Sequence, residues 1–231
     1  MEARDRVQEM STRKSSTTIG IASLKRMINH RKILGLGHPR TGTGYTAKIL
    51  GLWGLDVGHE VFGADGIVNW SFVHHSGRYP FSYRWTQTQR TRPECDHLIY
   101  NVRDPNTSIP SIASTENDPK TEAFNFRKSR MKIDLDNQNP IENAIESIHQ
   151  FDLKIRELNP SITYRIEDQD YYLYGQLSKY FNITYVQHRT KENTRHHANM
   201  HDLIYQYGKP RQEFIDKIED YCSYHGYPKL F

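Results

Sequence analysis

A glycine-rich turn between an apolar run and a helical pattern carries the clearest chemical signal in the sequence. Residues 32–37 (KILGLG) are typical of a buried parallel strand, and residues 46–55 (TAKILGLWGL) place apolar side chains at helical spacing. The turn between them is GHPRTGTG, residues 37–44. Glycines let backbone amides face an anion, and a helix N-terminus adds N–H groups and a positive dipole end. A tight turn alone would need the glycines, but not Arg40 and two threonines, so the unit predicts a phosphate-binding loop.

The turn differs from two common nucleotide-binding loops. Nucleoside triphosphatases carry GxxxxGK[ST], in which the lysine reaches the β- and γ-phosphates and the Ser or Thr holds magnesium. No lysine followed by Ser or Thr stands at that place here. The dinucleotide fingerprint GxGxxG would begin at Gly35 and require a glycine where Arg40 stands. ATP hydrolysis and NAD binding are therefore disfavoured, whereas a ligand with a 5′-phosphate is favoured.

The segment PRTGTGY, residues 39–45, resembles the 5′-phosphosulfate loop of sulfotransferases that use 3′-phosphoadenosine 5′-phosphosulfate (PAPS). The resemblance implies that Arg40 contacts the bridging oxygen and the sulfuryl group. It also implies that Tyr45 stacks on the adenine. The residues implied to hold the 5′-phosphate are Thr41, Gly42 and Thr43. Gly44 departs from the pattern, because threonine is usual there, and one hydroxyl contact to the nucleotide is lost.

A second predicted strand, residues 97–102 (HLIYNV), runs into Arg103, and Ser111 follows eight residues later. In the same family an Arg at a strand end and a Ser at this spacing hold the 3′-phosphate of the nucleotide, and an arginine fork suits a phosphate. The alternative is that Arg103 pairs with Asp104 or caps the sheet edge. The resemblance also places Asn193 and Arg195 in a second 3′-phosphate loop, although a charged surface loop fits that segment better.

Sulfuryl transfer to a hydroxyl is an in-line displacement that needs donors for the leaving 5′-phosphate and a base for the acceptor proton. A sulfuryl group carries less negative charge than a phosphoryl group, so no metal is expected. Glu60, twenty residues after Arg40, stands where some sulfotransferases carry a catalytic glutamate, and His59 is the rival base. An exposed polar turn is the alternative for both. His197 and His201 are four residues apart but lack further ligands, so surface histidines are favoured over a zinc site.

Alternating strands and helices predict one α/β domain, with a parallel sheet covered by helices on both faces in three layers. Residues 18–231 form this domain, the resemblance implies a P-loop-like sulfotransferase fold, and residues 1–17 are expected to be a mobile tail. The strands are predicted at 32–37, 97–102, 161–166 and 183–187. The helices are predicted at 18–31, 46–55, 106–116, 139–158, 171–181 and on both sides of Pro210 within 201–227. Pro110 suggests a late start or a kink in the third of these helices. Glu167 and Asp168 follow a strand and are expected to be structural.

Composition limits the other possibilities. The chain has 231 residues and a net charge of +4, a mild bias toward anions without a basic block, so a nucleic-acid partner is not expected. No stretch resembles a membrane span or a secretory signal, which favours a cytoplasmic protein. Cys95 and Cys222 are expected to be reduced thiols. The aromatic segment 74–96 is expected to help choose the acceptor.

The function predicted from these features is transfer of a sulfuryl group from PAPS to an acceptor hydroxyl, with adenosine 3′,5′-bisphosphate as the nucleotide product. The acceptor is a hydroxyl of a small molecule, a glycan or a peptide. Two alternatives stay open: a P-loop nucleotide kinase or triphosphatase, and a non-catalytic module that binds anions or nucleic acid.

Overall fold

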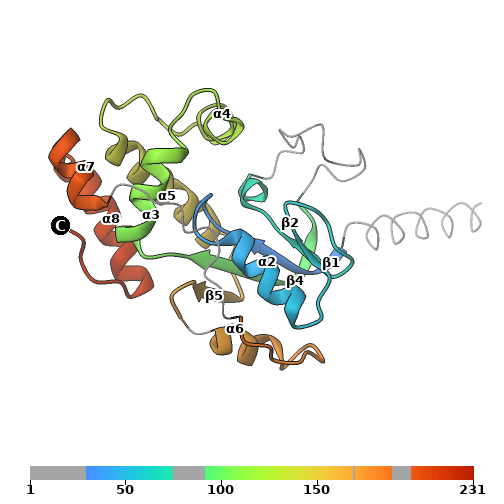
Figure 1. Ribbon diagram of the computed structural model, residues 1–231. Helices are drawn as coiled ribbons and strands as arrows, with labels where there is room; N and C mark the ends of the chain where they lie inside the picture. The colour runs from blue at the N-terminus through green and yellow to red at the C-terminus, as the bar shows by residue number, and fades with distance from the viewer. Residues whose placement is uncertain (1–29, 75–91, 169, 189–198) are drawn as a thin grey trace, which may run out of the picture.

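The structure is a computed structural model that describes residues 30–74, 92–168, 170–188 and 199–231. Its centre is a five-stranded parallel sheet in the order β2-β3-β1-β4-β5 (Figure 1). The strands are β1 (His30–Leu36), β2 (Val57–His59), β3 (Gly66–Val68), β4 (Glu94–Val102) and β5 (Ile162–Arg165). Because all five strands run the same way, the segments that follow them leave from one edge of the sheet.

Helices cover both faces of this sheet in the described part of the chain. They are α2 (Thr43–Leu52), α3 (Pro105–Thr115), α4 (Glu122–Ser129), α5 (Pro140–Arg156), α6 (Asp170–Leu177), α7 (Met200–Tyr207) and α8 (Gln212–His225), with a 3₁₀ turn at Trp70–Val73. Ile33 packs with side chains of α2 and α6, whereas its neighbour Leu34 packs with those of α3, α5, α7 and α8. This alternation gives two apolar cores and three layers, and it confirms the α/β prediction of a parallel sheet flanked by helices.

Three of the four predicted strands are present, and the one predicted at residues 183–187 is wrong. Ile183 and Tyr185 do pack against the α2 and α6 core, which explains the apolar alternation. The backbone carbonyls, however, are bound by side chains rather than by a strand. The Trp53 indole donates to Val186 O at 3.1 Å, and the Tyr174 hydroxyl donates to Ile183 O at 3.4 Å. The segment therefore lies on the helical layer without joining the sheet.

The sequence analysis missed β2, β3 and α4. The two strands have three residues each, and glycine, which weakens strand propensity, stands in both. At Gly66 a Cβ atom would lie 2.2 Å from Ile33 O, so only glycine allows this approach to β1. The other predicted helices within the described residues are present with shifted ends. Pro110 lies inside α3, which begins at Pro105 rather than late.

Several predictions fall outside the described residues: the tail 1–17, most of the helix at 18–31, residues 75–91 of the aromatic segment, and Asn193, Arg195 and His197. Within the described ranges, none of the helices combines the length and the apolar content needed to cross a bilayer. Both cysteines are free thiols, with Cys222 buried and Cys95 partly buried.

The conformation of Gly42 gives a prediction about stability. Its φ is +85°, and an added Cβ would lie 1.7 Å from Ile166 Cδ1. Gly42→Ala should lower the free energy of unfolding by about 2–4 kcal/mol, because left-handed strain and overpacking add. Gly51, inside α2, has open space around its Cα, so Gly51→Ala should stabilise the chain by about 0.5–1 kcal/mol. Urea titrations of both variants measure these changes, and equal effects at the two sites would contradict the assigned loop geometry.

Candidate functional site

The loop between β1 and α2 has the geometry of an anion-binding turn. A Cβ at Gly37 would lie 2.6 Å from Thr41 Oγ1 and 2.8 Å from Asn101 O, so the loop closes tightly on β4. The Thr41 hydroxyl is buried and donates to His38 O at 2.7 Å, which fixes the turn from inside. Gly42 caps α2 with no side-chain hydrogen bond. The first amides of α2 therefore have no capping side chain and suit an anion.

Arg40 lies in this loop in a strained conformation. Its φ is 79°, a region that residues other than glycine rarely adopt. Its side chain reaches α3, where Nε donates to the buried Ser111 Oγ at 3.0 Å. Strained backbone of this kind persists only where the surrounding structure enforces it, and it clusters at functional sites. The structure thus brings together Arg40 and Ser111, which the sequence analysis had assigned to opposite ends of one nucleotide.

Arg103 follows β4 and adds a second guanidinium at the same edge. Its Nη1 donates to Arg40 O at 3.0 Å, and its Nε donates to Thr107 Oγ1 at 3.0 Å. Burial lowers the pKa of Arg103; Glu167 opposes this effect, and the like charge of Arg40 adds to it. The Asp104 carboxylate caps α3 by accepting from Asn106 N at 2.8 Å. Two like charges are thus held near each other, with the carboxylates of Glu167 and Asp104 opposing their repulsion.

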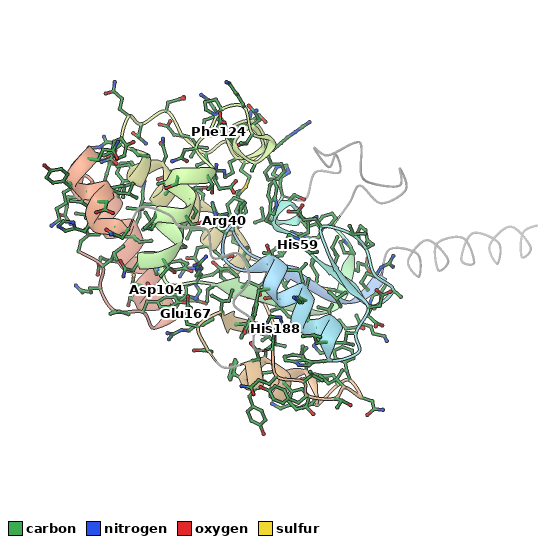
Figure 2. The ribbon with its side chains drawn as sticks, viewed as in Figure 1. Arg40, His59, Asp104, Phe124, Glu167 and His188 are labelled. Atoms are coloured by element: carbon green, nitrogen blue, oxygen red, sulfur yellow. The ribbon has the colours of Figure 1, made fainter. Side chains whose placement is uncertain are left out.

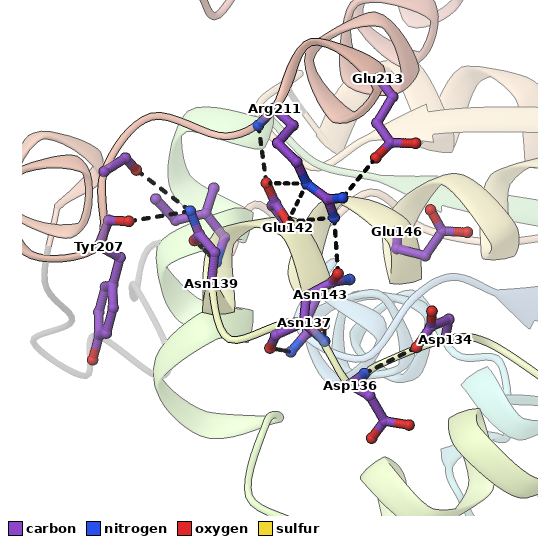
Figure 3. Close-up of polar contacts among 12 residues, drawn as sticks. Asp134, Asp136, Asn137, Asn139, Glu142, Asn143, Glu146, Tyr207, Arg211 and Glu213 are labelled. Carbon is purple, nitrogen blue, oxygen red and sulfur yellow. Dashed lines mark hydrogen bonds and ion pairs between the residues drawn. The ribbon is translucent and has the colours of Figure 1, made fainter.

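Helix α8 fixes the backbone of Arg103. The buried Tyr221 hydroxyl accepts from Arg103 N at 3.2 Å and donates to Arg103 O at 3.1 Å. At the start of α8, Arg211 makes four hydrogen bonds to the Glu142 carboxylate of α5 at 2.9–3.1 Å (Figure 3). Burial would raise the pKa of Glu142, but the hydrogen bonds from Arg211 outweigh it and lower that pKa. This contact holds α8 against α5 and so supports the edge that carries Arg103.

Glu60 and His59 lie where β2 ends, and both are partly exposed. Glu60 has a φ of 56°, and its Oε1 accepts from the Trp70 indole at 2.7 Å. The His59 Nε2 lies 3.2 Å from Thr43 Oγ1 in the first turn of α2 and 3.9 Å from Glu60 Oε1. Burial lowers the pKa of His59, and the Glu60 carboxylate opposes that shift. Both candidate bases therefore stand beside the loop, with His59 nearer to α2.

Gly44 lies beside this imidazole. A Cβ at position 44 would lie 3.5 Å from His59 Cε1, which is an ordinary van der Waals contact. A side chain at position 44 would therefore pack on the His59 ring.

Tyr45 points toward the opposite end of the sheet from His59. Its hydroxyl donates to Asp170 Oδ1 at 2.7 Å, and Tyr164 donates to the same oxygen at 2.9 Å. Burial, together with the Asp170 carboxylate, raises the pKa of Tyr45. Its ring meets His188 edge-on, with centroids 5.4 Å apart. These contacts fix Tyr45 between α2 and α6.

Figure 2 labels Arg40, Asp104 and Glu167, which follow the ends of β1, β4 and β5, and His59, which is the last residue of β2. Glu167 Oε1 accepts from Asp104 N at 2.9 Å and Oε2 accepts from the Tyr227 hydroxyl at 2.8 Å. Asp168 lies 3.6 Å from Arg165 Nε. These contacts agree with the structural role expected for the pair. No group of three or more potential ligands within the described ranges is arranged to hold a metal ion.

The sequence analysis did not identify Asn101, which joins three elements at this edge. Its Nδ2 donates to Leu36 O at 3.1 Å, and its Oδ1 accepts from Thr46 Oγ1 at 2.7 Å. A polar residue inside the apolar run HLIYNV was the available signal. Trp70 and Tyr221 were also missed, and nothing in their local sequence distinguishes them from core aromatics.

No protein-family model matches this chain, and no curated protein matches its sequence.

The contact between His59 and Glu60 predicts a titration behaviour. The pKa of His59 should lie below 6.5 and should fall further in Glu60→Gln, because the carboxylate charge opposes the effect of burial. Near pH 6 the folded chain then binds fewer protons at His59 than the unfolded chain does, so this group makes the free energy of unfolding rise with pH up to about 6.5. Following the imidazole by NMR in both proteins measures the shift. An increase of the pKa in Glu60→Gln would contradict the contact.

Proposed function

We propose that this chain is a PAPS-dependent sulfotransferase. The observation that carries the proposal is the meeting of Arg40 and Arg103 beside the α2 N-terminus, with Nη1 of Arg103 3.0 Å from Arg40 O. They follow β1 and β4, neighbouring strands in the centre of the sheet. In open α/β sheets, ligands bind outside the carboxyl ends of strands, where successive connections diverge to opposite sides. After β1 the polypeptide continues to β2 and β3 on one side of β1, and it then crosses to β4 on the other side. The carboxyl ends of β1 and β4 are therefore a place where successive connections diverge.

The chemistry of the donors fits a nucleotide with two phosphate groups. Backbone amides at a glycine-capped helix start suit the 5′-phosphate, and Arg40 lies beside them to neutralise charge that grows on it as the sulfuryl group leaves. Arg103 and Ser111 lie on the β4 side, where they would meet a 3′-phosphate. Ser111 Oγ accepts from Arg40 Nε, so this hydroxyl would meet a phosphate oxygen as a hydrogen-bond donor.

Glu60 is the proposed base. The indole bond from Trp70 engages Oε1 and orients the carboxylate, which leaves Oε2 to accept the proton of the acceptor hydroxyl. His59 would assist by holding Thr43 at the start of α2. In the proposed transfer, the acceptor oxygen forms a bond to sulfur as the bond from sulfur to the 5′-phosphate oxygen breaks. Adenosine 3′,5′-bisphosphate leaves, and the proton resides on Glu60.

Nucleotide binding measured by calorimetry tests the proposal. Wild type should bind adenosine 3′,5′-bisphosphate more tightly than AMP or ATP. Arg103→Ala should weaken the bisphosphate by about 10–100-fold, the loss expected for a charge-assisted phosphate contact, and should leave AMP nearly unchanged. Arg40→Ala should weaken both nucleotides. Arg130→Ala, an exposed charge after α4, is the control for net charge. Preference for ATP would instead support a kinase, and equal, salt-sensitive binding of all polyanions would support a binding module.

Turnover tests the assignment of the base. Glu60→Gln keeps an acceptor for the Trp70 indole but cannot take a proton, so kcat should fall by about 10²–10⁴-fold while bisphosphate affinity is retained. Transfer of labelled sulfate from PAPS to phenols, tyrosine peptides and oligosaccharides provides the measurement. Full activity in Glu60→Gln with activity lost in His59→Gln would assign the base to His59.

A further inference from the structure

A buried hydrogen-bond network runs from α4 through α5 to His38 in the loop and uses none of the residues proposed to bind the nucleotide. His38 Nε2 lies 2.6 Å from Ser147 Oγ of α5, and Arg127 Nη1 of α4 donates to the same oxygen at 3.1 Å. His38 Nδ1 contacts the carbonyl of Pro39. His38 is 2% exposed, and Arg127 and Ser147 are 0% exposed. Three segments far apart in the sequence thus meet at one hydroxyl.

The partners fix the direction of every hydrogen bond in this chain. A carbonyl oxygen only accepts, so Nδ1 of His38 must carry a proton to bond Pro39 O. Burial lowers the pKa of His38 well below its ordinary value, and the charge of Arg127 acts in the same direction, so the ring carries one proton only. Nε2 is then an acceptor, the Ser147 hydroxyl donates to it, and Ser147 Oγ accepts from Arg127. The order is Arg127 to Ser147 to His38 to Pro39 O.

The hydrogen-bond network begins at the buried guanidinium of Arg127, and the atoms that accept from it are neutral. Besides Ser147, the guanidinium of Arg127 donates to Ala123 O at 3.2 Å and to Glu116 O. Burial lowers the pKa of Arg127 to about 10, so the group stays charged near neutral pH. A charged donor strengthens the bonds that follow it in a chain, because each bond polarises the next. The Phe151 ring packs edge-on against the His38 ring, with the ring centroids 4.7 Å apart.

The geometry points to His38 as a positioning residue that holds Arg40 in its left-handed conformation, with Ser147 and Arg127 fixing the His38 tautomer. The ring of His38 binds the carbonyl immediately before Arg40, and the carbonyl of His38 accepts from both Thr41 N and Thr41 Oγ1 immediately after it. Arg40 is therefore tied on both sides through one residue. A strained φ of 79° persists where neighbouring contacts enforce it in this way.

NMR tests this role without reference to any nucleotide. Long-range ¹H–¹⁵N spectra of wild type at neutral pH should show His38 protonated on Nδ1 and not on Nε2. Ser147→Ala, which removes the middle link with little change in volume, should shift the amide resonances of residues 40–43. Tyr100→Phe removes another buried hydroxyl, the donor to Asp152, and should leave those amides unchanged. A proton on Nε2 in wild type would overturn the proposal even if Ser147→Ala did not fold.

A second measurement rests on the proposed function. Ser147→Ala should weaken adenosine 3′,5′-bisphosphate about tenfold, the effect of losing one supporting hydrogen bond, and raise KM for PAPS more than it lowers kcat. Ser147→Thr restores the hydroxyl and should recover most of the affinity. Failure of wild type to bind the bisphosphate would reject the sulfotransferase proposal. The positioning role of His38 would then be tested by the NMR measurements alone. Normal bisphosphate affinity and unshifted loop amides in folded Ser147→Ala would reject the positioning role.

Discussion

The hydrogen bond from the Arg103 guanidinium to the carbonyl of Arg40 is the contact on which the rest of the site depends. It joins the loop after β1 to the end of β4 and holds two positive side chains near each other. The like charge of Arg40 disfavours the charged form of Arg103, and the Glu167 carboxylate opposes this effect. The fold enforces the approach of the two residues, since Arg40 adopts a strained backbone and the backbone of Arg103 is held by a buried tyrosine. Two guanidinium groups at one edge would suit the doubly charged ligand proposed above.

The three layers explain how such an arrangement persists. The apolar core under α2 and α6 holds α2, the helix whose first amides lie at this edge. The other core holds the elements that support Arg103, and it lies under α3, α5, α7 and α8. The contact between Glu142 and Arg211 docks α8, and Tyr221 of α8 then reaches Arg103. The proposed hydrogen-bond network through His38 holds the backbone of Arg40 in a similar way. The backbone at both arginines is thus held by buried groups rather than by exposed ion pairs, whose stabilising effect is small.

Much of the fold follows from local pattern. The apolar runs of β1 and β4 and the period of α5 are long enough to be recognised, and the glycine loop lies where a strand meets a helix. The strand predicted at 183–187 is wrong because alternating apolar residues indicate only a buried face. A strand also needs backbone groups that can pair with a neighbouring strand. Here the side chains of Trp53 and Tyr174 bind backbone carbonyls of the segment. β2 and β3 are too short for any period to appear.

The candidate site was predictable only in part, for a related reason. Residue type and spacing singled out Arg40 and Arg103, which follow strands visible in the sequence. Ser111 was singled out by its spacing from Arg103, and Glu60 by its distance from Arg40. Their partners come from remote segments: Tyr221 lies 118 residues from Arg103, and Ser147 lies 109 residues from His38. Local sequence does not encode such contacts, and Ser111 bonding to Arg40 was not foreseen.

A crystal structure with adenosine 3′,5′-bisphosphate would show whether the two arginines bind one nucleotide. We expect the 5′-phosphate on the amides of Gly42 and Thr43 beside Arg40, and the 3′-phosphate on the guanidinium of Arg103. A nucleotide bound elsewhere on the chain, or one that approaches this edge with no phosphate on either arginine, would contradict this expectation.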